Sequence, residues 1–355
     1  MIEEIIIEVI DLKKYNVAIV GATGAVGKEF LNLIEERKFP FAELKMLASK
    51  RSAGTKINFM GKEYIVEETT ENSFKDVQFA LFAGGSASKL FASAAVKAGA
   101  IVIDNSSNFR MNPEVPLVVP EVNPQAIARH KGIIANPNCS TIIMVMALKP
   151  LYDISKIKRI VVSTYQAVSG AGREGMEELK NQVDEIVSGK SVEANVLPVS
   201  SLDKHYQIAF NLLPQIDVFK ENLYTKEEMK VTNETRKILH FDESVKISCT
   251  AVRVPVYRGH SEAVDIEFGV NVSPDEVRKI LEKSFGIKVI DNPAEFEYPT
   301  TRDASGVNPV FVGRIRKNLA FKNGITLWCV ADNLRIGAAL NTVRICKKVI
   351  EMELY

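Results

Sequence analysis

The sequence has few cysteines and no excess of charge of either sign. Its four cysteines, Cys139, Cys249, Cys329 and Cys346, are too few and too scattered for a disulfide framework or a paired CxxC zinc site. Among its 355 residues, 45 Lys and Arg balance 44 Asp and Glu to a net charge of +1. A nucleic acid or an anionic membrane is therefore not expected as a partner, and neither is a bound metal.

Long hydrophobic runs are also missing. The longest, such as residues 142–148, are far shorter than the ~20 residues that a transmembrane helix needs. The first residues, MIEEIIIEVIDLKK, mix acidic side chains into a short apolar stretch, whereas a secretory signal begins with basic residues. We therefore expect a cytoplasmic protein with reduced cysteines. Its length and its 46% hydrophobic and 25% charged residues are typical of a globular protein of about two domains.

From residue 15 to about residue 151, short apolar runs alternate with stretches of helical periodicity. These patterns predict strands at 17–20, 44–48, 79–82, 101–103 and 133–135, and helices at 28–37 and 88–97. Strands that alternate with helices indicate right-handed crossovers and a Rossmann-type, doubly wound parallel sheet. The first part of the chain is therefore expected to be an α/β domain.

After about residue 156 the pattern changes to that of a mixed α+β domain. Strands are predicted at 159–164, 248–256, 266–272 and 326–331, two of which alternate as strands with one solvated face do. Residues 188–217 have little periodicity and indicate a long surface excursion or an oligomer contact. Residues 334–352 are helical in pattern and would suit packing on either domain.

A glycine-rich turn follows the first predicted strand. Gly21-Ala22-Thr23-Gly24-Ala25-Val26-Gly27 lies between that strand and the helix that begins near Lys28. In this order, glycines let backbone N–H groups approach a pyrophosphate at a helix N-terminus. Glycines also serve plain tight turns, and the strand before and helix after favour the dinucleotide site.

The end of the second predicted strand favours NADP over NAD. An NAD site places Asp or Glu there for the ribose hydroxyls. This chain instead has Ser49-Lys50-Arg51-Ser52, whose cations and hydroxyls suit a 2′-phosphate. The alternative is a solvated basic turn.

Cys139 is the candidate nucleophile. In Asn136-Pro137-Asn138-Cys139-Ser140-Thr141 it lies between a strand and an apolar helix, and a helix N-terminus favours the reactive thiolate. The other three cysteines lie within strand or helix patterns, where cysteine is usually a small buried hydrophobe. A thiol beside a nicotinamide indicates aldehyde chemistry through a thioester.

His260 is the candidate partner base. It follows Arg253-Val254-Pro255-Val256-Tyr257-Arg258-Gly259, so one strand rich in basic residues would deliver a guanidinium and an imidazole to one place. A structural or merely exposed histidine is the alternative.

These motifs together resemble the aspartate-semialdehyde dehydrogenases. The resemblance rests on runs in family order over residues 17–346: GATGAVG, SKRSAGT, DNSSNFRMNPEVPLVVPEVN, NPNCST, STYQAVSGAGREGMEEL, AFNLLPQIDVF, YTKEEMKVTNETRKIL, RVPVYRGHSEAV and ADNLRIGAALNTVRI. It implies an NADP-dependent enzyme that interconverts aspartyl phosphate with aspartate semialdehyde and phosphate. In cells this family supplies lysine, threonine, methionine and diaminopimelate.

The resemblance implies a role for each matching residue. Cys139 corresponds to the thioester nucleophile, His260 to the general acid/base and Gln166 to a residue that orients the substrate. The implied substrate- and phosphate-binding residues are Arg110, Asn138, Glu227, Lys230 and Arg253. Without the resemblance, Glu227 and Lys230 would be interpreted as a surface ion pair, since residues three apart share one face of a helix.

For the cofactor, the resemblance implies that the phosphate loop and the 2′-phosphate contacts occupy the positions already singled out, and it adds residues near the nicotinamide. The implied cofactor-binding residues are Gly21, Thr23, Gly24, Ala25, Val26, Ser49, Arg51, Ser52, Ser169, Gly170 and Asn333. The expected division is an N-terminal extension (1–14), an NADP-binding domain (15–140), a catalytic and dimerisation domain (141–331) and a C-terminal helix (332–355) that returns to the NADP-binding domain. A homodimer or a pair of dimers is expected.

Two departures and two rival functions accompany the resemblance. The segment before Tyr15 extends beyond the usual family start, and Asn222-Leu223-Tyr224-Thr225 replaces the Asn-Gly-Tyr-Thr of many relatives. The nearest rival is another acyl-phosphate reductase, such as N-acetyl-glutamyl-phosphate reductase, whose substrate is one methylene longer. A rival of another class is a non-catalytic NADP-binding regulator with an unreactive Cys139.

Overall fold

The computed structural model describes residues 13–355. Residues 1–12, which make up most of the expected N-terminal extension, lie outside the described residues. The chain forms two compact units, the first of residues up to 120, 124–137 and 338–355, and the second of residues 121–123 and 138–337. The boundaries at 137/138 and 337/338 lie a few residues from the expected 140/141 and 331/332. Cys139 therefore belongs to the second unit, because its helix does.

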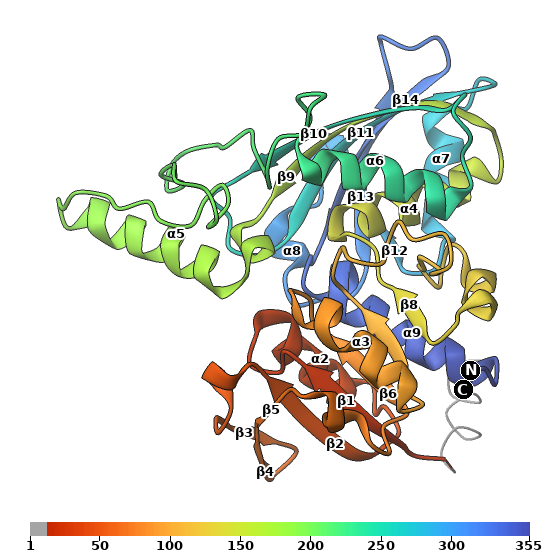
Figure 1. Ribbon diagram of the computed structural model, residues 1–355. Coiled ribbons are helices and arrows are strands. Elements are labelled where there is room, and N and C mark those ends of the chain that lie inside the picture. The colour runs from red at the N-terminus through yellow and green to blue at the C-terminus, as the bar shows by residue number, and fades with distance from the viewer. Residues whose placement is uncertain (1–12) are drawn as a thin grey trace. The chain divides into compact units, whose positions relative to one another are not determined.

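The first unit contains a parallel sheet of six strands in the order β5-β2-β1-β6-β7-β8 (Figure 1). Its main elements are β1 (Tyr15–Val20), α2 (Ala25–Glu36), β2 (Phe41–Ala48), β5 (Glu67–Glu68), β6 (Phe79–Phe82), α3 (Ala87–Lys97), β7 (Ile101–Asp104), β8 (Ile133–Ala135) and α9 (Leu340–Glu351). The strands form because their apolar runs are buried on both faces, as β6 is at every position. The predicted doubly wound sheet is confirmed.

A small hairpin in this unit was not predicted. Strands β3 (Lys56–Phe59) and β4 (Lys62–Ile65) pair antiparallel around Met60 and Gly61, which both have positive φ. This backbone is the one that two-residue hairpins require. The strands carry Lys and Glu and bury little, so no periodic hydrophobic signal marks them.

The second unit contains a mixed sheet of six strands in the order β10-β9-β11-β14-β13-β12. Its elements are α4 (Cys139–Tyr152), β9 (Ile157–Gln166), α5 (Gly172–Val187), α6 (Lys226–Leu239), β10 (Lys246–Arg253), β11 (His260–Phe268), α7 (Pro274–Glu282), β12 (Ile287–Val289), α8 (Thr301–Ala304), β13 (Val310–Lys317) and β14 (Gly324–Ala331). The β10-β9 and β12-β13 pairs are parallel and the others antiparallel. The predicted mixed α+β domain is confirmed.

Two strand predictions in this unit were wrong in extent. The strand expected at 266–272 is β11, which begins at His260 and ends at Phe268. Its first residues, His260, Ser261 and Glu262, are buried although polar, so they gave no hydrophobic signal. The strand expected at 248–256 ends at Arg253, which places Arg253 and His260 on two different strands rather than one.

The irregular excursion between α5 and α6 is held by side chains of α5. The Glu178 carboxylate accepts N–H groups from Asn195, Val196 and Leu197 at 2.5, 2.8 and 3.0 Å. Gln182 accepts two more N–H groups, from Ile208 at 2.8 Å and Ala209 at 3.0 Å. Backbone groups that no helix or sheet satisfies are thus paired with two buried polar side chains.

The last predicted helix begins later than expected. Residues 335–339 form one π-helical turn, and α9 starts at Leu340. This helix belongs to the first unit, where it packs on α2 and β7. Among residues 13–355, no helix is long and apolar enough to cross a membrane.

Candidate active site

Three predicted site residues form a row on one face of the second sheet. Arg253 ends β10 and pairs in register with Gln166, which ends β9. His260 begins β11, the antiparallel neighbour of β9, and its Nε2 lies 3.4 Å from Gln166 Nε2. All three side chains are buried, with at most 4% of their surface exposed. Strand ends separated by up to 94 residues in the chain thus meet at one edge of the sheet.

The candidate nucleophile begins the helix that packs against this face. Cys139 is the first residue of α4, and Asn138 caps the helix by accepting N–H groups from Ser140 at 3.0 Å and Thr141 at 3.2 Å. Cys139 is partly exposed, whereas Cys249, Cys329 and Cys346 are buried. Burial raises the pKa of each of those three thiols. Only Cys139 therefore combines access with the electrostatic setting of a helix N-terminus.

The space next to the Cys139 side chain depends on a glycine, Gly337. A Cβ at Gly337 would lie 2.7 Å from the Cys139 Cβ. Such an approach is shorter than any real side-chain contact, so another residue at 337 would displace α4 or its neighbour.

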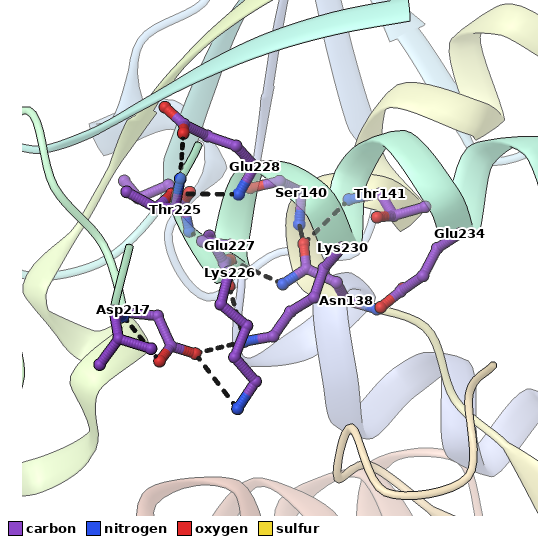
Figure 2. Close-up of polar contacts among 12 residues, drawn as sticks. Asn138, Ser140, Thr141, Asp217, Thr225, Lys226, Glu227, Glu228, Lys230 and Glu234 are labelled. Atoms are coloured by element: carbon purple, nitrogen blue, oxygen red, sulfur yellow. Dashed lines mark hydrogen bonds and ion pairs between the residues drawn. The ribbon is translucent and has the colours of Figure 1, made fainter. Parts of the chain in front are cut away.

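Helix α6 places the Glu227 carboxylate beside the N-cap Asn138 (Figure 2). Glu227 Oε1 accepts hydrogen bonds from Asn138 Nδ2 at 2.7 Å and Gln166 Nε2 at 3.1 Å, and its Oε2 accepts one from Lys230 Nζ at 3.0 Å. Burial alone would raise the pKa of Glu227. The Lys230 charge and these hydrogen bonds instead hold it at about 2, so the group is a carboxylate at neutral pH.

Lys230 is shared between two carboxylates. Its Nζ also lies 3.0 Å from Asp217 Oδ2, at the end of the irregular excursion. Burial would lower the pKa of Lys230, but Glu227 and Asp217 raise it above its usual value. The expected Glu227–Lys230 pair therefore exists, and it is a half-buried pair within the site rather than a surface pair.

His260 is held neutral in a defined orientation. Its Nδ1 accepts the Ala167 N–H at 3.1 Å, so the proton of the neutral ring is assigned to Nε2. Burial and the Arg253 charge lower the pKa of His260 to about 3. The ring thus presents an Nε2–H that the Gln166 amide nitrogen 3.4 Å away, itself a donor, does not accept.

Arg253 has a guanidinium that the protein satisfies only in part. Its Nη1 donates to the Ala167 carbonyl at 2.9 Å, whereas its Nε is buried with no partner among the described residues. Burial lowers its pKa, although an arginine stays charged. A Cβ at Gly170 would lie 2.7 Å from Nη1, so the glycine leaves room at this group. The planar donor set fits a carboxylate.

The residues expected near the nicotinamide are linked to each other. Ser169 Oγ donates to Asn333 Oδ1 at 3.0 Å, and the Gly259 N–H donates to the same oxygen at 3.0 Å. Gly170 follows Ser169 in a short turn after β9. Asn333 thus joins the turn after β9 to the turn before β11.

The glycine turn of the first unit has the form of a dinucleotide-binding loop. Gly21 has φ +89°, and a Cβ at Gly27 would lie 2.2 Å from the Gly21 carbonyl oxygen. Helix α2 begins at Ala25 with no side-chain cap on its N-terminal N–H groups. Thr23 and Val26 flank this start. A pyrophosphate fits such uncapped N–H groups.

The predicted 2′-phosphate contacts lie on the next strand end. Ser49 precedes a short 3₁₀ turn of Lys50, Arg51 and Ser52, directly after β2. No acidic residue lies in the turn, and Arg51 is exposed. These groups suit a phosphate better than a bare ribose.

Arg110 belongs to the first unit, whereas the other predicted substrate-binding residues belong to the second. It donates from Nη2 to the Asn105 carbonyl at 2.8 Å. The loop before it is organised by the buried Asp104, which accepts from Ser106 Oγ at 2.6 Å. The role of Arg110 in phosphate binding stays a prediction.

Comparison with known proteins identifies the family. Two family models match, the semialdehyde dehydrogenase NAD binding domain over residues 16–130 and the semialdehyde dehydrogenase dimerisation domain over residues 148–336. An aspartate-semialdehyde dehydrogenase of Aquifex aeolicus is 55% identical over 95% of this chain and 98% of its own length. That of Bacillus subtilis is 50% identical over 96% and 98%. The chain belongs to the aspartate-semialdehyde dehydrogenase family.

Solved structures of this family share the fold. Aspartate semialdehyde dehydrogenase II of Vibrio cholerae, complexed with ASA, matches with a TM-score of 0.90 and 47% identity over 96% of this chain and 99% of that one. The Candida albicans enzyme, crystallised with NADP, matches with a TM-score of 0.75 and 25% identity over 97% and 100%. The resemblance seen in the sequence is confirmed.

Several residues of the site were not singled out from the sequence. Asp217 binds Lys230, Glu234 accepts the Asn138 N–H at 2.6 Å, and Gly337 makes room for Cys139. Glu234 lies on the same face of α6 as Glu227 and Lys230, seven and four residues further along the helix. This spacing is a sequence signal that could have identified it. Asp217 and Gly337 come from distant segments and leave no such signal. Among the described residues, no group of His, Cys, Asp and Glu could hold a metal ion.

Proposed function

We propose that this chain catalyses the NADPH-dependent reductive dephosphorylation of L-aspartyl 4-phosphate to L-aspartate 4-semialdehyde. The observation that carries the proposal is the set of buried polar groups around one accessible thiol. Cys139 begins a capped helix whose cap, Asn138, is bound to the carboxylate that also binds Gln166 and Lys230. Family membership supports the substrate.

The first step forms a thioester on Cys139. The thiolate sulfur attacks the acyl carbon of aspartyl phosphate, the C–O bond to the phosphate breaks, and phosphate leaves with the electron pair. Lys230, together with Arg110, is assigned to the charge of the departing phosphate. Arg253 is assigned to the α-carboxylate, for which its partly satisfied guanidinium is suited.

The second step releases the aldehyde. When bound, NADPH supplies the hydride that reduces the thioester carbon. The His260 Nε2–H is assigned to hydrogen-bond the oxygen of the resulting thiohemiacetal and to hold or return its proton while the C–S bond breaks. Gln166, fixed between Thr164 and Glu227, is assigned to orient the reacting carbonyl.

The cofactor is proposed to be NADP rather than NAD. The loop at Gly21 and the uncapped start of α2 fit a dinucleotide pyrophosphate, and Arg51 and Ser52 fit a 2′-phosphate. Ser169, Gly170 and Asn333 are assigned to positions near the nicotinamide.

The proposed assembly is a homodimer. The second unit coincides with the matched dimerisation domain. Along β9, buried side chains alternate with partly exposed ones, among them Val161, Ser163 and Tyr165. Trp328 of β14 packs against Tyr165 on the same face, at 5.4 Å between ring centroids. We assign this sheet face to a second copy of the chain.

The proposed function is tested by phosphate-dependent reduction of NADP and, separately, of NAD at pH 8 to 9. Aspartate semialdehyde and N-acetylglutamate semialdehyde are compared, with wild type against Cys139→Ser and, as a matched control, Cys249→Ser. Turnover of aspartate semialdehyde with NADP should be nearly abolished by Cys139→Ser and kept by Cys249→Ser. If only N-acetylglutamate semialdehyde is turned over, the substrate assignment is wrong although the chemistry stands. If neither semialdehyde is turned over, the protein is better explained as a non-catalytic NADP-binding regulator.

A further inference from the structure

Glu262 is a buried acid that the proposed mechanism does not use. The residue is fully buried in β11, and neither carboxyl oxygen has a well-formed hydrogen bond among the described residues. A buried polar group without partners destabilises the folded state, because its lost hydration is not replaced. A buried acid of this kind, on the strand that carries His260, calls for a functional explanation.

The position of Glu262 is directly behind the catalytic row. It follows His260 by two residues, so both side chains lie on the same face of β11. In register it lies opposite Thr164 of β9 and Cys329 of β14. Thr164 in turn donates to Gln166 at 3.0 Å. Glu262 therefore belongs to a second row that supports the first.

Ser140 connects Glu262 to the nucleophile. Ser140 follows Cys139 in the first turn of α4 and is fully buried. Helix α4 packs on β11, and the Ser140 hydroxyl acts on the pKa of the Glu262 carboxyl. Ser140 Oγ, like the Glu262 carboxyl oxygens, lacks a well-formed hydrogen bond among the described residues. The hydroxyl and the carboxyl group are therefore each able to serve as the hydrogen-bond partner of the other. Its backbone N–H is already fixed by Asn138.

The surroundings favour the neutral acid. Burial raises the pKa of Glu262 well above its usual value, and only Ser140 opposes this shift. The nearby titratable groups are Cys249, Cys329 and His260 on the same sheet face, and Glu227 and Glu228 of α6, which act with Glu262 on Cys249. Arg253 of β10 also lies on this face, but its charge acts on His260 rather than on Glu262, and none of the other groups is positive at neutral pH.

We propose that Glu262 is a positioning residue for Cys139. As a neutral acid it donates its carboxyl hydrogen to Ser140 Oγ and fixes the first turn of α4 on the sheet. Because it carries no charge, it adds no second negative charge beside the thiolate. The inference deepens the proposed function and rests on Cys139 being the nucleophile.

The test compares wild type with Glu262→Gln, Glu262→Met, Ser140→Ala and the double variant Glu262→Met/Ser140→Ala. Glutamine keeps a neutral donor of the same shape. Methionine removes the donor at similar volume, and replacing an unpartnered buried polar group by an apolar one can be neutral for stability, so this variant should fold. Urea unfolding of each variant verifies this.

The first readout is the pH dependence of Cys139 alkylation by iodoacetamide, which needs no substrate. Glu262→Gln should keep the midpoint of wild type and a rate within about threefold. Glu262→Met should slow alkylation about fivefold or more, and the double variant should be no slower than Glu262→Met alone. A midpoint moved to lower pH in Glu262→Gln would reveal a carboxylate in wild type and overturn the proposal.

The second readouts separate this inference from the proposed function. The infrared C=O band of a protonated carboxyl should be present in wild type at pH 7.5 and lost in Glu262→Gln. With aspartate semialdehyde, Glu262→Met should lower kcat about tenfold and change KM less than twofold. Equal alkylation in Glu262→Met and wild type would refute the positioning role. If the alkylation pattern holds while wild type turns over no aspartate semialdehyde, the proposed function alone fails.

Discussion

At the scale of single residues, burial and neighbouring charges set the protonation states of the site. Glu227 stays a carboxylate because Lys230, Asn138 and Gln166 compensate its burial. His260 stays neutral because burial and Arg253 oppose its protonation. A neutral imidazole with its proton on Nε2 can donate to a substrate oxygen without a prior change of charge.

The pKa of His260 predicts a pH dependence of stability. It is about 3 in the folded protein and about 6.5 in an unfolded chain. As the pH falls below 6.5, the unfolded chain takes up the proton first, so the folded state loses stability between pH 6.5 and about 3. Between pH 7 and pH 5, this residue should lower the free energy of unfolding by roughly 2 kcal/mol.

Urea unfolding of wild type and His260→Asn at pH 7 and pH 5 measures this effect. The variant should lose less stability on acidification than wild type. His240→Asn is the control, because His240 is exposed at a left-handed helix end that asparagine tolerates. Equal losses in wild type and His260→Asn would contradict a neutral buried imidazole.

Arg51 carries a prediction about cofactor choice. Arg51→Ser should raise KM for NADP about tenfold and leave KM for NAD nearly unchanged, since a guanidinium that binds the 2′-phosphate has no such partner on NAD. Steady-state kinetics with both cofactors measures the ratio. Lys50→Ser is the matched control on the same turn. An equal effect in both variants would indicate only a general attraction of the basic turn for anions.

At the scale of elements, the site depends on how helix α4 starts. Its N-cap Asn138 is held at the backbone by Glu234 and at the side chain by Glu227, both from α6. Such a start is more rigid than a cap alone, because two carboxylates from another helix restrain one residue. Reacting groups that are held in place react faster than mobile ones.

Gly337→Ala tests this dependence on placement. The added Cβ meets the Cys139 Cβ at 2.7 Å, so one backbone must move. We expect a loss of about 1–3 kcal/mol in unfolding free energy and a fall in kcat of roughly tenfold or more. Gly269→Ala is the control, because its Cβ would meet only ordinary contacts from 3.5 Å outward. A fully active Gly337→Ala variant would show that catalysis does not depend on the exact placement of α4 and Cys139.

At the scale of the whole molecule, each unit has its own sheet and its own set of predicted residues. The first carries the dinucleotide loop and the second carries the thiol and the row of strand-end side chains. The match of the second unit to a dimerisation domain agrees with its partly exposed sheet face.

Val161→Glu should dissociate the proposed homodimer. Val161 lies in β9, between β10 and β11, on the partly exposed face. A charge buried there against a second copy without a partner is strongly unfavourable. Sedimentation analysis should show a shift from dimer to monomer for this variant, but not for Leu319→Glu, whose side chain is fully exposed in a loop. A dimer unaffected by Val161→Glu would place the interface elsewhere.

The sequence alone was enough to predict the parallel sheet and to single out the glycine loop and the candidate nucleophile. These are local signals: apolar runs buried on both faces, glycines between a strand and a helix, and a cysteine at a helix start. Gln166 was found only by resemblance, whereas His260 and Arg253 were singled out by a run that was wrongly predicted to be one strand. The row that these three side chains form, the polar start of β11, and the contacts of Asp217, Glu234 and Gly337 with the site became visible only in the folded chain. Their contacts join segments tens of residues apart, and such pairings depend on strand register and helix packing rather than on neighbouring residues.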